Sequence, residues 1–477
     1  MNVRLICGLA GALILCGCSM APRYTAPAVV EVASYKEAGA WLPAQPADTQ
    51  PRGPWWQAFG DPQLDALESQ LKSSNPDLRA AAARVEQARA LAGRARSAEY
   101  PSVGAQGSAT RERSSANAPV ASLPGGVPVT RNDLLAAFDL SWEIDLFGRL
   151  RNSAVAAGAQ AQASAADLAA VELSLQAELA TDYFSLRGDD ATMNLLEDTV
   201  TAYDRAFDLT RNRHEGGIAA ATDVDQADTL RQNARAQLAA VRLERAQLEH
   251  AVAVLLGESP SRFALEPGTL AGAPPAIDAG LSSTLLQRRP DIARAERAVA
   301  AANAQIGVAR AAWFPVFTLG GVAGYESTLA SSWFTAPSRL WSLGPSAQLP
   351  LLDAGARSAL VRQAWAQHDE AVANYRKTTL TAYQEVEDNL AALHHLAEGL
   401  AADDAAAASA QSSAKHADAR YAAGVADYVE VTSTHTAALQ AQRAVLAARV
   451  ARMNAAVGLV RASGGGWTRA QLDHPEL

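Results

Sequence analysis

The chain contains the same pattern of segments twice, and this internal repeat constrains the fold more than any other feature. The segment "NPDLRAAAARVEQARALAGRARSAEYP" at 75–101 returns as "RPDIARAERAVAAANAQIGVARAAWFP" at 289–315. Likewise "RHEGGIAAATDV" at 213–224 returns as "RYAAGVADYVEV" at 420–431. Chance similarity between alanine-rich helices would not keep proline, glycine and arginine at matching positions. The sequence therefore predicts two copies of one architecture.

Each copy is expected to form the same series of elements. Proline followed by aspartate opens a helix, which ends at a Tyr-Pro or Phe-Pro break. A β-hairpin, a very long helix, a glycine turn and a shorter return helix follow. In the first copy (61–270) the hairpin, long helix and return helix are expected at 101–147, 149–213 and 220–256. In the second copy (281–462) they are expected at 315–352, 356–420 and 427–462, before a C-terminal tail at 463–477.

The two long helices are too long for an ordinary globular core. Neither 149–215 nor 356–423 contains a proline, so each segment, if continuous, would be about 100 Å long. Their small, alanine-rich faces suit close side-by-side packing in a coiled-coil-like wall.

The hairpin strands have one apolar and one polar face. In "FDLSWEIDLFGRL" at 138–150, apolar side chains alternate with Asp139, Glu143 and Asp145, which is the period of a half-buried strand. The second copy shows the same alternation at Trp341, Leu343, Ala347, Leu349 and Leu351. Each strand has roughly the 9–11 residues of a tilted transmembrane strand. The loops 111–133 and 326–339 would join the strands of each hairpin.

A four-stranded sheet cannot lie alone in lipid, because its edge amides and carbonyls would have no partner. The hairpins must therefore close with hairpins from other subunits. Two chains would give eight strands and a filled interior, whereas three would give twelve and leave a lumen. For one strand taken alone, a soluble sandwich remains the alternative.

The N-terminus carries an export signal. The first eighteen residues contain all three cysteines and a short apolar run, as in a secretory signal peptide. The ending Leu15-Cys16-Gly17-Cys18 resembles a bacterial lipobox, which predicts removal of 1–17 and lipidation of Cys18. An ordinary cleaved signal peptide is the alternative. The mature chain would then have no disulfide framework.

Several motifs together give a family resemblance that covers nearly the whole chain. They are "CSMAPRYTAP", "PWWQAFGDPQLDAL", "NPDLRAAAARVEQARA", "SWEIDLFGRLR", "RRPDIARAERAVAAANAQIGVARAAWFP" and "GIAAATDVDQA". With them the chain resembles the outer-membrane efflux proteins, or TolC-like channels, in the lipoprotein branch that serves RND pumps. The resemblance implies an α+β membrane protein that forms a homotrimer in the outer membrane of a Gram-negative bacterium. A twelve-stranded β-barrel, four strands per chain, would continue into a periplasmic α-helical barrel, with 18–60 contributing to a belt around its middle.

The glycine turns carry the first candidate site. Arg213, Gly217, Arg420 and Gly424 match the tip motif of that family, which implies docking with a periplasmic adaptor protein. Glycine can adopt the left-handed conformation that ends a helix. In the alternative interpretation each arginine only caps its own helix and each glycine only turns the chain.

Two carboxylates just beyond the turns are candidates for a periplasmic gate. Asp223 and Glu430 would each form a ring in a three-fold channel, where like charges repel or coordinate cations. Ser433 stands where relatives of this family often carry aspartate, and His435 follows where an arginine network would be expected. The alternative is that these are solvated side chains on helix faces.

Other functions are not favoured by the sequence. A net charge of -9 argues against nucleic-acid binding, and no arrangement of residues indicates an enzyme or a cofactor. His394 and His395 are adjacent, so they are expected to point apart, and they lack the spacing of a zinc pair. The glycines at 464–466 are expected to form a flexible tail, not a phosphate loop.

The predicted function is an exit duct for drugs, dyes and other toxic compounds. An adaptor and an RND inner-membrane transporter would load it, and its acidic strand faces predict a mild preference for cations. A periplasmic coiled-coil lipoprotein scaffold is the alternative from another class. Within the channel class, a type I secretion duct or a metal-efflux duct remains open.

Overall fold

The computed structural model describes residues 19–28, 35–37, 54–113, 115, 130–270, 272–276 and 288–467. It divides into two compact units. Unit 1 contains the described parts of Met1–Pro27, Val85–Ala163 and Ala295–Tyr375, and unit 2 contains those of Ala28–Arg84, Ser164–Arg294 and Arg376–Leu477. Each unit includes parts of both repeats, so the compact units do not coincide with the repeated halves of the sequence.

The first repeat contains the elements that its sequence pattern predicts. After the short 3-10 helix η1 come α2, α3, β1, β2, α4 and α5, at Trp55–Phe59, Pro62–Ser74, Pro76–Ser97, Ser102–Arg113, Thr130–Ile144, Arg149–Glu215 and Ala221–Leu255. Helix α3 begins at the predicted proline, and the buried Asn75 caps it by accepting a hydrogen bond from the N–H of Leu78 at 2.9 Å.

The second repeat follows the same order. Its elements α7, β3, η3, η4, β4, α8 and α9 lie at Pro290–Ala311, Val316–Ser327, Ala330–Ser332, Ala336–Ser338, Arg339–Gln348, Ala356–Ala422 and Tyr428–Ala462. The long helices α4 and α8 have 67 residues each. No helix of the described residues combines the length and apolar character that a membrane span requires.

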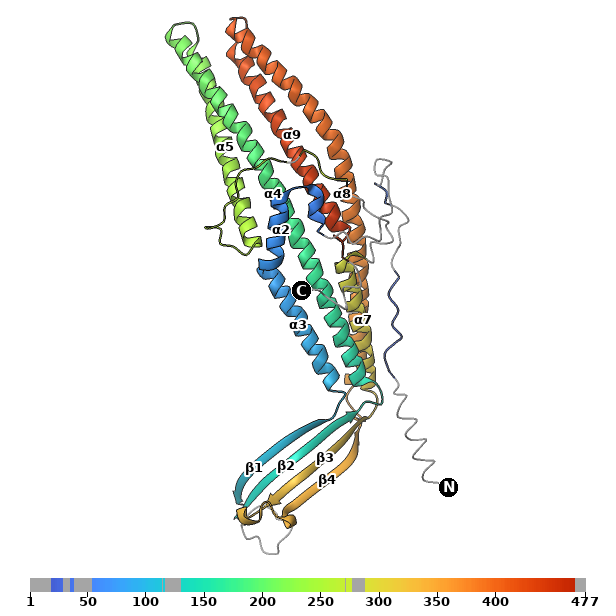
Figure 1. The fold of residues 1–477 in the computed structure, drawn as a ribbon. Helices are drawn as coiled ribbons and strands as arrows, with labels where there is room; N and C mark the ends of the chain where they lie inside the picture. Colours follow the sequence, from blue (N-terminus) through green and yellow to red (C-terminus); the bar gives the residue numbers. More distant parts are fainter. Residues whose placement is uncertain are drawn as a thin grey trace. The chain divides into compact units, whose positions relative to one another are not determined.

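In unit 1 the four strands form one antiparallel sheet in the order β1-β2-β3-β4 (Figure 1). Phe138 of β2 lies opposite Ala105 and Ala323, and Ala323 lies opposite Trp341. Residues directly opposite each other share a face, so the predicted apolar face of β2 continues across all four strands. Within the chain this face is uncovered, since Phe138 is 64% and Trp341 80% exposed.

The other face of the sheet is mostly polar or carries small side chains, with Leu135 and Leu340 as larger apolar residues. Asp139 lies opposite Gly104 and Val322, and Val322 lies opposite Ser342. A side chain at Gly104 would meet the Asp139 carboxylate at 2.5 Å. The two-faced pattern predicted from one strand is thus confirmed for the whole sheet.

The strand ends differ from the sequence-based expectation. Strand β4 ends at Gln348, so Leu349 and Leu351 do not belong to its apolar face; Pro350 has no N–H to continue a ladder. Strand β2 ends at Ile144, before the turn into α4. The predicted loop 111–133 is shorter, because β1 continues to Arg113 and β2 begins at Thr130.

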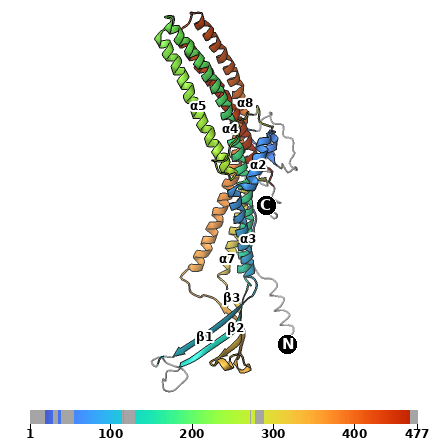
Figure 2. The ribbon, with the colours of Figure 1, turned by 60° about the vertical axis from the view of Figure 1, so that its left-hand side comes forward.

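In unit 2 the helical hairpins α4–α5 and α8–α9 lie side by side in both views (Figures 1 and 2). Their packing is built from small clusters instead of one thick core. Leu196 of α4 contacts Leu238 and Val241 of α5 and Leu439 of α9. Alanine-rich faces allow this close approach, as the composition predicts.

A network around Arg187 of α4 also lies in unit 2. Its side chain is 1% exposed, and it donates hydrogen bonds to Asp190 at 2.7 Å, to the Glu266 carbonyl at 2.8 Å and to Gln63 at 2.5 Å. Arg245 of α5 reaches the same aspartate at 2.6 Å. The network therefore links α2, α4, α5 and the segment that follows α5.

The structure corrects the prediction made for the glycines at 464–466. A side chain at Gly464 would lie 2.2 Å from the Arg288 carbonyl oxygen, and one at Gly465 would lie 2.2 Å from Leu173. All three glycines have positive φ. They form a turn that packs against the chain at the end of α9, not the flexible tail that the sequence suggested.

Candidate functional site

The two turns that join the long helices to the return helices have the same backbone. Gly217 and Gly424 both have a φ of 74°. The amide of the residue after each glycine donates a hydrogen bond to the carbonyl of the arginine five residues earlier. Ile218 donates to Arg213 at 2.8 Å, and Val425 donates to Arg420 at 3.0 Å. This is a helix C-cap that requires a left-handed residue, so both predicted glycines occupy the positions that need them.

The arginine side chains at these turns do not have equivalent contacts. The Arg213 guanidinium lies over the ring of Tyr421, 5.0 Å from its centroid, so it connects the end of α4 to the end of α8. Arg420 instead forms an ion pair of 3.3 Å with Glu430, at the start of α9. The two side chains contact neighbouring elements, and the carbonyl capping considered from the sequence is provided by backbone amides.

The three gate candidates have different surroundings. Glu430 is partly exposed and paired with Arg420. Ser433 is exposed and its hydroxyl donates to the Glu430 carbonyl at 3.0 Å, inside its own helix. Asp223 lies in the first turn of α5, and its charge, after the larger effect of burial, raises the pKa of the Tyr421 hydroxyl. Asp223 therefore lies close to the second hairpin, which the sequence did not predict.

An aromatic cluster beneath the turns was missed by the sequence analysis. Tyr428 is buried with Val431, Ala227 and Ala417, and Phe207 and Tyr421 pack against them. Burial raises the pKa of Tyr428 to about 12. The sequence did contain a signal for this cluster. Tyrosines stand at 421 and 428, on both sides of the second turn, and the first turn has no tyrosines at the matching positions.

His435 takes part in the same region. Its Nε2 lies 2.8 Å from a carboxylate oxygen of Asp418 on α8, and its ring meets that of Tyr203 on α4 edge-on, with centroids 5.7 Å apart. At the position where the family resemblance suggested an arginine network, an imidazole thus links three helices of unit 2.

Each turn also exposes one apolar side chain beside its glycine. Ile218 is 72% and Val425 65% exposed. Both follow the glycine directly, so the two turns present the same backbone and the same kind of side chain. Isolated exposed apolar residues are ordinary, whereas these two occupy matched positions of the two repeats.

In unit 1 the carboxylates of β2 and of the turn that follows it carry less free charge than the sequence suggests. The Arg149 guanidinium donates to both oxygens of Glu143, at 2.9 and 2.5 Å. The Asp145 carboxylate accepts from the backbone N–H of Arg151 at 2.9 Å and pairs with its side chain. Two of the three carboxylates are therefore neutralised at the start of α4.

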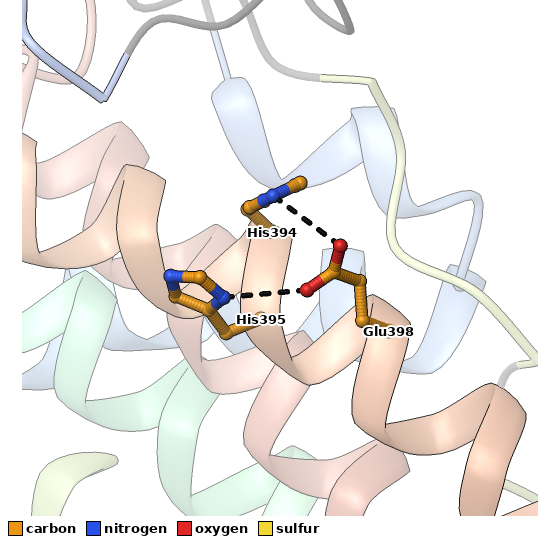
Figure 3. Close-up of side chains that lie close together, drawn as sticks. All are labelled: His394, His395 and Glu398. Carbon is orange, nitrogen blue, oxygen red and sulfur yellow. Dashed lines mark hydrogen bonds and ion pairs between the residues drawn. The ribbon is translucent and has the colours of Figure 1, made fainter.

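The histidine pair on α8 requires a correction. His394 Nε2 lies 3.6 Å and His395 Nδ1 3.4 Å from different oxygens of Glu398. The two rings do not point apart, because both turn toward this carboxylate (Figure 3). Residues three and four positions away share a helix face with Glu398, which the spacing of the two histidines alone does not reveal.

The predicted lipidation site Cys18 lies outside the described residues. The segment that follows it is part of unit 1 and packs against helices of that unit. Ser19 donates to the Asn152 side chain at 3.0 Å, and Asn303 donates to the Pro22 carbonyl at 2.9 Å. The Tyr24 hydroxyl donates to the Glu296 carboxylate. The start of the expected mature chain is thus attached to α4 and α7.

Comparison with known proteins decides the family. The model of the family described as "Outer membrane efflux protein" matches residues 67–258 and 281–465. The chain belongs to the outer membrane efflux protein family. The two matched ranges correspond closely to the two repeats.

Individual relatives agree with this assignment. The efflux protein is 35% identical over 462 residues to the antibiotic efflux pump outer membrane protein ArpC of Pseudomonas putida, covering 96% of this chain and 94% of the relative. It is 30% identical over 459 residues to the cation efflux system protein CusC of Escherichia coli O157:H7, covering 96% and 97%. The structure of the outer-membrane channel OprN matches with a TM-score of 0.87 at 30% identity, covering 94% of this chain and all of that one.

These findings establish the class of the efflux protein. Its relatives are outer-membrane components of efflux pumps, and its fold is that of solved outer-membrane channels. The family is a transport family and not an enzyme family, in agreement with the prediction from the sequence.

Proposed function

We propose that this efflux protein forms a homotrimeric outer-membrane duct that gives small molecules a passive exit. An adaptor and an RND inner-membrane transporter would deliver the molecules, and the turns at the helix ends would gate the duct. The main support for this proposal is the sheet of unit 1. It has one continuous apolar face and one mostly polar face, and its outer strands β1 and β4 are each paired with a single neighbour.

Three-fold assembly follows from the needs of that sheet in a membrane. The apolar face suits lipid and the polar face suits water, but the open edges of β1 and β4 do not tolerate hydrocarbon. Pairing β4 of one chain with β1 of the next removes the edges. Four strands from each of three chains then close a barrel with a lumen, whereas two chains would leave none.

The gate would involve Glu430 and Asp223, with Ser433 as a weaker position. The Arg420–Glu430 pair is solvent-exposed, so its contribution to stability is small, about 0.2–1 kcal/mol. Glu430 can therefore exchange Arg420 for another partner at little cost. Glu430 in three copies would narrow the opening and favour cations over anions. The pairing of Glu143 and Asp145 with arginines reduces the cation preference expected from the strands.

The adaptor would dock on the turns themselves. Arg213, Gly217, Arg420 and Gly424 would shape the surface, and Ile218 and Val425 would supply apolar contacts of equal kind on each hairpin. This repeated surface would let one adaptor motif contact both turns.

Cys18 would carry the lipid anchor. The contacts of Ser19, Pro22 and Tyr24 with unit 1 support this proposal, because they would fix the residue that follows the anchor. Relatives include proteins named for efflux of antibiotics, toluene and cations, and we expect the partner transporter to select the substrates of this chain.

Conductance across a planar bilayer tests the proposal. The purified full-length protein should insert as a trimer and show ion-conducting steps, and Glu430→Ala should reduce the cation preference. Complementation of a strain that lacks its outer-membrane efflux channel should restore resistance to dyes and antibiotics. A soluble monomer after Cys18→Ala, with no conductance, would instead support the coiled-coil scaffold.

A second experiment tests docking separately. The double variant Ile218→Asp/Val425→Asp should conduct normally but fail to restore resistance. Leu209→Asp, which alters an exposed apolar residue within α4 and not in a turn, is the control and should retain activity. If the double variant restores resistance as well as the wild type, the turns are not the docking surface.

A further inference from the structure

The side chains of His394, His395 and Glu398 on α8 form a cluster that neither gating nor docking uses. Their ligand atoms all lie within 4.8 Å of one another. Figure 3 shows both imidazole rings facing the carboxylate. The cluster lies on one helix, so its geometry does not depend on the relative positions of separate elements.

The spacing of the ligand atoms is close to that of a metal site. At metal–ligand distances of about 2.0–2.2 Å, two ligands of a tetrahedral ion lie about 3.3–3.6 Å apart. The observed separations are 3.6 Å for His394 Nε2 to the carboxylate and 3.4 Å for His395 Nδ1 to its other oxygen. The two nitrogens face different oxygens of Glu398, so binding through one carboxylate oxygen requires the side chains to rotate until all three ligand atoms, now within 4.8 Å of one another, meet the ion. The exposed His395 can provide much of this rotation.

We propose that His394, His395 and Glu398 bind a divalent transition-metal ion, with Cu²⁺, Ni²⁺ and Zn²⁺ as the class of ligand. Two imidazole nitrogens and one carboxylate oxygen suit these ions, whereas Mg²⁺ and Ca²⁺ prefer ligand sets made of oxygen alone. The cluster contains no sulfur, which argues against Cu⁺. Three protein ligands leave coordination positions for water, so the ion would exchange readily.

The site is distinct from the other histidines whose contacts are described. His416 on the same helix lies 3.5 Å from Ser412, and His435 faces a single carboxylate of Asp418. In the described part of the chain, His394, His395 and Glu398 are the residues that bring three possible ligand atoms together. Chelation by three groups on one helix should therefore give tighter binding than any single imidazole.

Titration of the full-length protein, purified without a histidine tag, tests the proposal. The probes are Cu²⁺ and Zn²⁺ added singly, with Mg²⁺ as the negative control, and binding is followed by calorimetry and by the electron paramagnetic resonance of Cu²⁺. We expect one tight site per chain with nitrogen ligands. His394→Ala, His395→Ala or Glu398→Gln should weaken it about tenfold or more, since even residues outside the ligand shell change metal affinity about 10–100-fold.

His416→Ala is the matched control and should bind as the wild type does. Equal affinity and an unchanged Cu²⁺ spectrum in the His394→Ala/His395→Ala variant would overturn the proposal. If that variant does not fold, chemical modification of the wild-type histidines decides the question. Zn²⁺ should protect His394 and His395 but not His416, and uniform protection or none would again overturn it.

Discussion

Arginine side chains connect the helices of unit 2 at two places, in opposite ways. Arg187 is buried and has three hydrogen-bond partners from three segments. Arg213 and Arg420, at the turns, are solvent-accessible, and each has one described contact. A buried charge with every partner in place is costly to disturb, whereas an exposed pair is exchanged at little cost. The same residue type thus fixes one part of the helical hairpins and leaves their ends free to rearrange.

Removal of the buried arginine should have the largest effect. Arg187→Ala leaves Asp190 with Arg245 and the Gly268 N–H and removes the donor to Gln63 and the Glu266 carbonyl, which should cost about 3–5 kcal/mol. We expect loss of folded protein, measured by the temperature at which the helical circular-dichroism signal disappears. Arg205→Ala, on the same helix but away from the network, should leave that temperature unchanged. If both variants lost their helical signal at the same temperature, the proposed contrast between the buried and the exposed arginines would be wrong.

A buried carboxylate in the same unit predicts a pH effect. Glu68 is 0% exposed, neither of its oxygens has a hydrogen-bond partner among the described residues, and burial followed by repulsion from Glu172 raises its pKa to about 9. The folded chain then holds a proton that the unfolded chain releases at about pH 4.5. Stability should therefore fall as the pH rises from about 4.5 to 9, by up to about 1.4 kcal/mol per unit.

Glu68→Gln should remove this slope. Its melting temperature should exceed that of the wild type at pH 8 and approach it at pH 5. The exposed Glu86→Gln change serves as the control. A wild type that melts at the same temperature across this range would contradict the assignment.

Substitution of the turn glycines should have a smaller effect on the free energy of unfolding. Gly217→Val and Gly424→Val force a left-handed backbone on a branched residue, at a cost of about 1–2 kcal/mol. No other atom lies within 4 Å of a Cβ placed at either position, so we attribute the effect to the backbone. Both variants should fold but lose complementation of an efflux-deficient strain, whereas Gly424→Asn should retain it. Gly399→Ala inside α8 is the control.

The smallest effects should distinguish the two turns from each other. A double-mutant cycle on Arg420 and Glu430 should give about 0.2–1 kcal/mol, and one on Arg213 and Tyr421 about 0.5–1 kcal/mol. Only the second pair joins the two hairpins, so Tyr421→Leu should increase the frequency of channel opening more than Glu430→Gln does. Equal opening frequencies would show that the hairpins do not move separately.

Much of the fold was predictable because it depends on local patterns. The repeated Pro-Asp and glycine positions gave the helix starts and the turns, and the alternation around Phe138 gave the two faces of the sheet. These features depend on backbone preferences and periodicity, which a single sequence contains. The predicted strand ends were less accurate, because the length of the neighbouring strand decides where pairing stops.

The side-chain contacts of the candidate site were mostly not predictable. Arg187 has the appearance of an ordinary surface residue of a helix, and only the return of distant segments near Gln63 and Glu266 makes it buried. The contact of Arg213 with Tyr421 likewise depends on how the two hairpins approach each other. The convergence of His394 and His395 on Glu398 depends on side-chain rotation, which spacing does not specify.

The open outer edges of β1 and β4 have a genetic consequence. If three copies close one ring by joining β4 to β1, a chain with a proline in β1 breaks every ring that it enters. In a cell that produces altered and normal chains equally, about one ring in eight would then contain three normal copies. A single damaged allele of this kind would be dominant over the intact gene.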